Sequence, residues 1–305
     1  MEIKLKTNLK QTARLNTDIA GAITELQSVM KQFRLRKDIY RIIFRGKGLE
    51  FEGFRDFSPD DDATDIDWKT SSRARKLIVK QYREERDLKI MFLVDVGNNM
   101  VFGSGKKLKC EYAAELVSAF AKIIIENNDQ VGFFIFSDGV KYFIPPKVGE
   151  KHFQFLTDIL TKTSTYGGTT NLDGALDYAL ESLNKGIHSV ILVSDFLRVT
   201  DETEKKLTLL ANQYESIFIR VRDLLDFTLP DISEEMILQD PLTNEQIIVN
   251  PKIARASYEK HAYEQSKIVE DMFKKTQGDY IDLITDRSFA VPLALFLKGR
   301  LEGKG

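Results

Sequence analysis

Between residues 88 and 222, short continuous apolar runs alternate with longer segments in which apolar residues recur at helical spacing. The runs predict strands at 88–94, 131–136, 189–193 and 217–221. The periodic segments predict helices at 108–127, 152–162, 172–184 and 200–214. Continuous apolar runs are typical of parallel strands covered by helices on both faces. The pattern therefore predicts an α/β fold with a doubly wound, mostly parallel sheet, to which 140–144 adds a hairpin partner.

The flanking segments divide the chain into three parts, 1–87, 88–222 and 223–305. In the first part, apolar residues from Ile19 to Phe33 recur at helical spacing, which predicts an amphipathic helix with Thr17 as its N-cap. No helical period runs through 41–87, so we expect a loop-and-hairpin module there, with a short strand at 77–82.

The sequence of the third part predicts one hairpin, whose two strands lie on either side of Asp240-Pro241. It then predicts a long helix from Pro251 to about residue 277, a strand at 280–284 and a short helix at 292–299. Since no Pro/Gly/Ser-rich linker separates the three parts, we expect them to form one compact body.

Composition and charge exclude several classes of protein. With 43% hydrophobic and 30% charged residues, the chain can bury a core and is not of the disordered type. The net charge is −2, and the 20 basic residues among residues 1–90 have 15 acidic neighbours, so we expect no nucleic-acid partner. One cysteine, Cys110, excludes an internal disulfide. No signal-type or membrane-spanning apolar run occurs, so we expect a cytoplasmic protein without a transmembrane segment.

Polar residues follow the predicted strands where ligands bind on such sheets. Asp95 follows the first strand, Asp195 follows a later one, and Thr170 comes after the Gly167-Gly168 pair at the start of a helix. Carboxylate, amide and hydroxyl oxygens are the ligands that Mg²⁺, Mn²⁺ and Ca²⁺ prefer. Asn99 completes a candidate metal site with these three residues.

This set resembles the metal-ion-dependent adhesion site of von Willebrand factor A-type domains, built from Asp-x-Ser-x-Ser, a later Thr and a later Asp. Asp95, Gly97, Asn99, Thr170 and Asp195 match the five positions. Both serines are replaced, so the resemblance implies the fold and a degenerate site with Mg²⁺ or Mn²⁺ as candidate cofactors. The alternative is a metal-free site in which Asn99 and Thr170 hydrogen-bond the two carboxylates and repulsion raises the pKa of one of them.

A second resemblance covers roughly residues 41–200. It rests on Gly46-x-Gly48-Leu49-Glu50-Phe51, Phe54-Arg55-Asp56-Phe57-x-Pro59, Ile66-Asp67-Trp68-Lys69 and Ser72-x-Ala74-Arg75. These segments resemble the prokaryotic proteins grouped as domain of unknown function 58. The resemblance implies a non-enzymatic adaptor for protein–protein interaction. It also implies a MoxR-type AAA+ ATPase as partner, in protein assembly, maturation or stress response.

The charged segment 46–86 allows two interpretations. In one, its acidic and basic residues pair with each other and Trp68 fills the edge of the core. In the other, it is a recognition face, because Trp and Arg are frequent anchors of interfaces. The candidate partner-binding residues are Asp61, Asp62, Asp67, Trp68, Arg73, Arg75 and Arg86.

The alternative function is a metal-dependent hydrolase that uses Asp95 and Asp195. The fold permits it, since fold does not decide function. However, no nucleophile elbow, phosphate-binding loop or dinucleotide fingerprint follows a predicted strand. We therefore expect a protein that is not an enzyme.

Overall fold

The computed structural model describes residues 13–33, 35, 49–58, 66–84, 88–184, 186–239 and 245–302. Its centre is a six-stranded sheet in the order β10-β7-β6-β3-β4-β5. The inner strands are β3 (Lys89–Asp95), β4 (Gln130–Phe136), β6 (Ser189–Ser194) and β7 (Glu215–Arg222). All neighbouring strands pair in parallel except β5 (Val140–Lys147), which is antiparallel to β4 at one edge. The predicted α/β fold with a mostly parallel sheet is confirmed.

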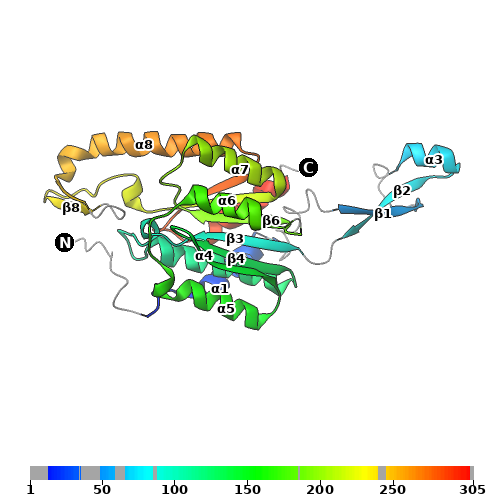
Figure 1. The fold of residues 1–305 in the computed structure, drawn as a ribbon, viewed down its shortest axis with the longest axis horizontal. Helices are drawn as coiled ribbons and strands as arrows, with labels where there is room; N and C mark the ends of the chain where they lie inside the picture. The colour runs from blue at the N-terminus through cyan, green and yellow to red at the C-terminus, as the bar shows by residue number, and fades with distance from the viewer. Residues whose placement is uncertain are drawn as a thin grey trace.

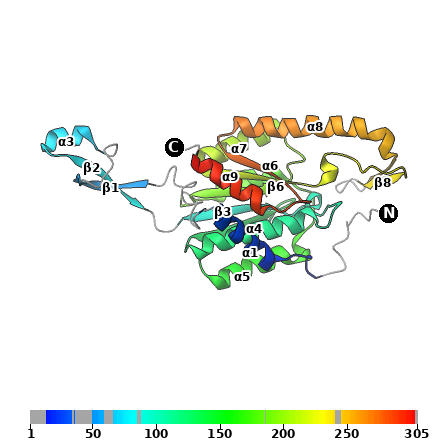
Figure 2. The same ribbon diagram turned by 180° about the vertical axis from the view of Figure 1, so that it is seen from behind.

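Helices cover both faces of the sheet (Figures 1 and 2). One layer consists of α1 (Ile19–Gln32), α4 (Lys109–Glu126), α5 (Glu150–Thr161) and α9 (Ala290–Glu302). The other consists of α6 (Leu172–Ser182), α7 (Asp201–Gln213) and α8 (Pro251–Lys275). Along β3, Ile90 and Phe92 belong to the first core and Met91 and Leu93 to the second. Because successive side chains of a strand point to opposite faces, a buried strand with a core on each side must be apolar throughout.

The N-cap of the leading helix α1 lies one residue later than predicted. Asp18, not Thr17, caps α1, and its carboxylate accepts a hydrogen bond from the backbone N–H of Gly21 at 2.8 Å. The backbone N–H of Asp18 itself donates to Glu115 of α4 at 2.7 Å. This tertiary contact places the helix start at Asp18, and the local sequence around Thr17 and Asp18 alone allows either residue.

The segment before the sheet contains more regular structure than its sequence pattern predicts. A hairpin of β1 (Leu49–Asp56) and β2 (Ile78–Glu84) carries the short helix α3 (Trp68–Ala74) between its strands. The expectation of no helix in 41–87 is therefore wrong. Ser71 fixes α3 to the hairpin, because its hydroxyl accepts a hydrogen bond from the N–H of Ile78 at 2.9 Å. Seven residues are too few for a helical period to be read from sequence.

The β1–β2 hairpin with α3, which we call the arm, lies outside the layered body in both views (Figures 1 and 2). The expectation of one compact body therefore does not extend to the arm. At the opposite end, β8 (Met236–Gln239) and β9 (Gln246–Val249) form a small hairpin next to α8.

The tail joins the body through its strand β10 (Asp279–Ile284), which extends the sheet beside β7. Asp282 pairs in register with Arg220 of β7, whose side chain is only 2% exposed. The Arg220 Nε–H donates to Asp282 Oδ1 at 2.5 Å, and a second guanidinium nitrogen contacts Oδ2. This two-point contact is the closest carboxylate contact of the buried arginine, which also lies 3.6 Å from Glu270 and donates to Ser266.

We expect Asp282→Ala to lower the free energy of unfolding by about 3 kcal/mol, because it removes the carboxylate that forms the two-point contact with the buried Arg220. Urea unfolding at pH 7 measures the change. The control is Glu202→Ala, which removes a carboxylate from an exposed ion pair with Lys205 and should change the stability little. Equal effects of the two substitutions would show that the Arg220–Asp282 contact does not hold the tail to the body.

Candidate functional site

The carboxyl ends of the strands bring the four predicted residues Asp95, Asn99, Thr170 and Asp195 together. Asp95 is the last residue of β3, Asn99 lies in the short 3₁₀ turn η4 (Asn98–Met100), and Asp195 follows β6. The loop of Thr170 is held by two backbone hydrogen bonds of 2.8 Å, from Gly167 N–H to the Val96 carbonyl and from Asn98 N–H to the Gly168 carbonyl.

Gly167 and Gly168 have φ angles of 122° and 88°. Residues with a Cβ rarely adopt this region, so the glycine pair is what allows the loop to bend over Asn98. The turn places the hydroxyl of Thr170 within 2.8 Å of Asp95 Oδ1. Thr170 thus lies at the side of Asp95, where the sequence analysis placed it.

Asp95 is completely buried and accepts four hydrogen bonds. Its Oδ1 accepts from the backbone N–H of Gly97 at 2.9 Å and from Thr170, and its Oδ2 accepts from the Asn99 amide at 3.0 Å and the Ser194 hydroxyl at 2.8 Å. Burial, followed by repulsion from Asp195, raises the pKa of Asp95 to about 6 despite these bonds.

Asn99 separates the two carboxylates. Its side-chain NH₂ donates one hydrogen to Asp95 Oδ2 at 3.0 Å and the other to Asp195 Oδ1 at 2.9 Å, while its carbonyl oxygen contacts the Thr170 hydroxyl. With the opposite amide orientation, a carbonyl oxygen would face two carboxylates, which only a cation between them would stabilise. Asn99 therefore acts as a donor to both acids.

Lys109 is part of the site although the sequence pattern did not indicate it. It is the first residue of α4, and its side chain is 1% exposed. Its Nζ lies 2.8 Å from Asp195 Oδ2 and 3.4 Å from Asp226 Oδ2, with Asp226 in the 3₁₀ turn η6 (Leu224–Asp226) after β7. Burial lowers the pKa of Lys109, but the two carboxylates outweigh burial and raise it above its usual range.

A cation at the first residue of a helix is unfavourable, because the N-terminus carries the positive end of the helix dipole. The lysine at the start of the predicted helix 108–127 was thus a detectable signal. Asp226 follows the predicted strand 217–221, so its position at the carboxyl edge was indicated, but its contact with Lys109, more than a hundred residues away, was not.

The site does not fit a divalent cation in the manner of the resembled adhesion site. A Cβ at Gly97 would lie 2.0 Å from the Thr170 hydroxyl and 2.5 Å from Asn99 Oδ1, so there is no room for the serine of that motif. The oxygens of Asp95 and Asp195 accept from N–H and O–H donors. No group of three or more His, Cys, Asp or Glu residues suited to a metal was found in the described residues.

The structure shows four of the seven predicted partner-binding residues on the arm. Asp67 caps α3, and its carboxylate accepts a hydrogen bond from the Thr70 N–H at 2.8 Å. Trp68 is 65% exposed, so the interpretation that it fills the edge of the core is wrong. Arg73 and Arg75 are exposed, and neither forms an ion pair with a described residue. Asp61, Asp62 and Arg86 lie outside the described residues.

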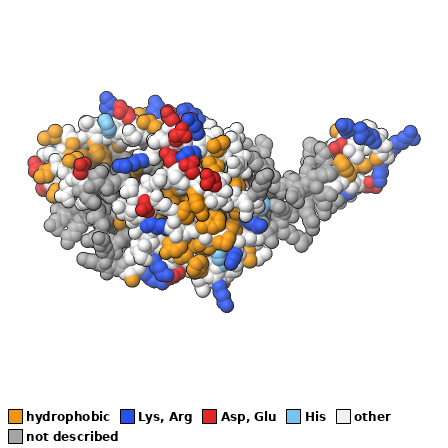
Figure 3. Space-filling view, viewed as in Figure 1, with side chains coloured by type: hydrophobic (Ala, Val, Ile, Leu, Met, Phe, Trp, Pro, Cys, Tyr) orange, Lys and Arg blue, Asp and Glu red, His pale blue; other side chains and the backbone are white. Residues whose placement is uncertain are grey.

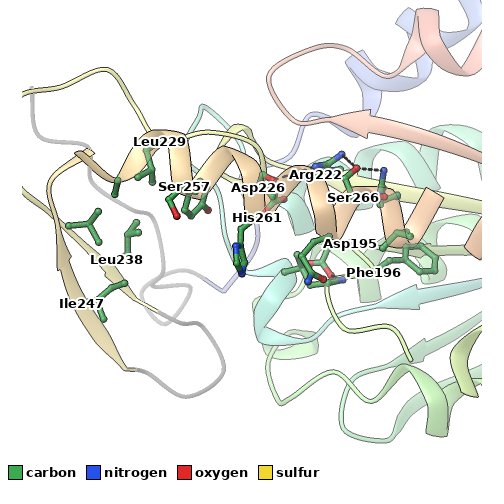
Figure 4. A pocket seen from close by; sticks show the side chains of 18 residues that line it. Asp195, Phe196, Arg222, Asp226, Leu229, Leu238, Ile247, Ser257, His261 and Ser266 are labelled. Carbon is green, nitrogen blue, oxygen red and sulfur yellow. Dashed lines mark hydrogen bonds between the residues drawn. The ribbon is translucent and has the colours of Figure 1, made fainter. Parts of the chain in front are cut away.

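A cavity of about 630 Å³ adjoins the strand-end site between the sheet, α8 and the β8–β9 hairpin (Figure 4). Leu229, Leu238 and Ile247 line one end. Asp195 and Asp226, the two acids that Lys109 contacts, line the other end. The two carboxylates therefore lie between the buried lysine and a space that solvent and ions can enter.

Comparison with known proteins assigns the chain to a family. The sequence profile of the family described as proteins of unknown function DUF58 matches residues 53–268. Uncharacterized proteins of Mycobacterium bovis and Mycobacterium tuberculosis are 24% identical over 294 residues, which cover 93% of this chain and 90% of each relative.

Several solved structures are similar in fold. The BatB protein of Bacteroides thetaiotaomicron has a TM-score of 0.44 at 13% identity, covering 70% of this chain and 99% of that one. The SpRpn10 VWA domain has a TM-score of 0.40 at 13% identity, covering 68% and 93%. A mussel byssus thread matrix protein, solved with a zinc-occupied adhesion-site motif, has a TM-score of 0.34 at 17% identity, covering 44% and 36%. At these values the likeness carries no inference about a ligand or a partner.

The raised pKa of Asp95 makes the stability depend on pH. The folded-state pKa is about 6 and the ordinary value is 3.8, so the folded state binds the proton more tightly. The contribution of Asp95 to the free energy of unfolding should therefore be present below its ordinary pKa and fall by about 3 kcal/mol in total as the pH rises from about 3 to about 7.

Asp95→Asn removes this titration, so the difference in unfolding free energy between wild type and Asp95→Asn should change across this pH range. Urea unfolding at several pH values in EDTA measures it, with chelator present so that no cation lowers the pKa. Parallel curves for the two proteins would contradict the prediction.

Proposed function

The chain belongs to the DUF58 family, and from that premise we propose that it is a non-enzymatic protein–protein interaction module whose partner is a MoxR-type AAA+ ATPase. The fold supports the general part of this proposal, because open α/β sheets serve as binding modules as readily as enzymes. The specific partner is implied by the sequence resemblance.

One observation supports the proposal most: the exposure of Trp68. A tryptophan gains stability by burial, yet this one is 65% exposed on α3, at the free end of the arm. Phe54 of β1 and Leu77, next to β2, are also close to half exposed. Large apolar side chains in this position contribute little to the core, and they are suited to burial against another molecule.

Basic residues surround Trp68. Lys69, Arg73, Arg75 and Lys76 are exposed on or next to α3, and Lys and Arg side chains gather at the free end of the arm (Figure 3). Of these, Lys76 pairs with Asp56 at 2.7 Å, while the arginines form no ion pair with a described residue. Trp68 is the first residue of α3 and Arg73 lies in its last turn, while Arg75 caps its C-terminus with a left-handed backbone conformation. A partner that offers a hydrophobic pocket with acidic residues beside it would fit this end of the arm.

Asp67 has a different role in this proposal. Its carboxylate caps α3 and so fixes the orientation of the helix that presents Trp68. We therefore assign Asp67 to positioning and Trp68, Arg73 and Arg75 to contact.

The hydrolase alternative finds little support at the strand ends. A metal-dependent hydrolase needs carboxylate oxygens that bind a cation or activate water. Asp95 and Asp195 instead accept hydrogen bonds from Asn99, Thr170, Ser194 and Lys109. The residues at the strand ends do not fit the Mg²⁺ or Mn²⁺ that the resemblance implied, and the cytoplasmic location stays a prediction. None of the helices in the described part of the chain combines the length and apolar character of a membrane span.

We expect Trp68→Ala to weaken binding to a purified MoxR-type AAA+ ATPase from the same organism at least thirtyfold, as for interface anchors worth about 2 kcal/mol. Arg75→Glu should weaken it as well, because it reverses an exposed positive charge at the C-terminal end of the same helix. Isothermal titration calorimetry with each variant measures the affinity, and the thermal unfolding midpoint shows whether the fold is retained.

The matched control is Tyr263→Ala, since Tyr263 is 68% exposed on α8 in the body. It should bind like the wild type. If the wild type does not bind the ATPase, the partner assignment fails. If it binds and Trp68→Ala has no effect, the arm is not the contact surface.

A further inference from the structure

We propose that the ammonium of Lys109 supplies the positive charge that a divalent cation supplies in the resembled adhesion site, so that the carboxyl edge of this sheet is built to work without metal. The proposal starts from a requirement of charge. Asp95, Asp195 and Asp226 are buried or nearly buried at this edge, with Asp226 only 12% exposed, and the buried Asp223 beside them accepts hydrogen bonds from Ser104 and Thr285. Such a group needs a cation or protons to be stable.

Lys109 meets this need from one position. Its ammonium contacts Asp195 and Asp226 together, at 2.8 and 3.4 Å, so it joins the loop after β6 to the turn after β7. The ring of Phe102 lies over the same ammonium, with its centroid 5.5 Å from Nζ. Each of these three contacts favours the charged form of the lysine.

The remaining substitutions in the motif have the same effect. Gly97 removes one oxygen ligand and leaves space that the Thr170 hydroxyl and the Asn99 carbonyl fill. Asn99 turns its NH₂, not its oxygen, toward Asp95 and Asp195. Lys109 thus stands where the resembled site has a cation, and Gly97 and Asn99 stand where it has two serine ligands.

The position of Lys109 also predicts the effect of removing its ammonium. Mg²⁺ is often held by one or two carboxylates while it keeps several waters. Asp195 and Asp226 would offer two such carboxylates at the place of the ammonium, next to the cavity that both residues line. Lys109→Ala should therefore turn a metal-independent site into a metal-dependent one.

The experiment compares the wild type with Lys109→Ala and the control Lys107→Ala. Lys107 is two residues away and pairs with Glu115, outside the strand-end site. Thermal unfolding is measured in EDTA and in millimolar Mn²⁺ or Mg²⁺. Lys109→Ala should unfold at a lower temperature than the wild type in EDTA and gain about 5 °C with Mn²⁺, the rise expected of a site near saturation. The wild type and Lys107→Ala should not respond.

Direct Mn²⁺ binding, followed by electron paramagnetic resonance, gives a second measurement on the wild type. One bound Mn²⁺ per chain that Asp195→Ala removes would overturn the proposal, and so would a Lys109→Ala variant that folds without responding to metal. If Lys109→Ala does not fold, Lys109→Arg keeps the charge and should fold and bind no Mn²⁺. Binding of Mn²⁺ by Lys109→Arg would count against the proposal. None of these results depends on whether the arm binds an ATPase.

Discussion

The structure depends on how the charge of three carboxylates is balanced at one edge of the sheet. Parallel strands end at a common edge, so Asp95 and Asp195, which follow two adjacent strands, must lie close together. Asp226 reaches the same place from the turn after β7. Lys109 contacts the second and third of these acids and holds the first turn of α4 against two loops. The central strands, the helix between β3 and β4, and the connection to the tail therefore meet at one buried ammonium.

The strand-end site and the arm differ in whether their side chains have partners within the protein. The polar groups of the strand-end site find partners within the protein, so little in it remains to attract a ligand: Asn99 uses both of its amide hydrogens, and Asp95 accepts four hydrogen bonds. The arm is the opposite case. Trp68 is exposed, and the two exposed arginines, Arg73 and Arg75, form no ion pair with a described residue. The polar groups at the strand ends are hydrogen-bonded within the protein, whereas the apolar and basic side chains of the arm are exposed. This contrast favours the arm, and not the strand-end site, as the surface that recognises a partner.

Much of the fold could be predicted because its signals are local. The strands β3, β4, β6 and β7 and the helices α4 to α7 lie within two or three residues of their predicted bounds. The helix α3 could not be predicted, since it is a single short stretch fixed by a hydrogen bond between Ser71 and Ile78. For the candidate site, the strand ends indicated Asp95 and Asp195, and the resemblance to the adhesion-site motif indicated Asn99 and Thr170. Lys109 was missed because its one signal in the sequence, a lysine at a helix start, does not show which carboxylates the lysine contacts.

The sequence by itself determined the class of fold, the edge of the sheet where polar groups meet, and four residues that lie there. These follow from alternating patterns and from the order of elements along the chain, which act over short distances. The tertiary structure alone decided how the amide of Asn99 is oriented, that Lys109 and Asp226 complete the site, and that Trp68 is exposed on an arm. Each depends on contacts between segments tens to a hundred residues apart, where the charge and space available to one side chain are decided by the others.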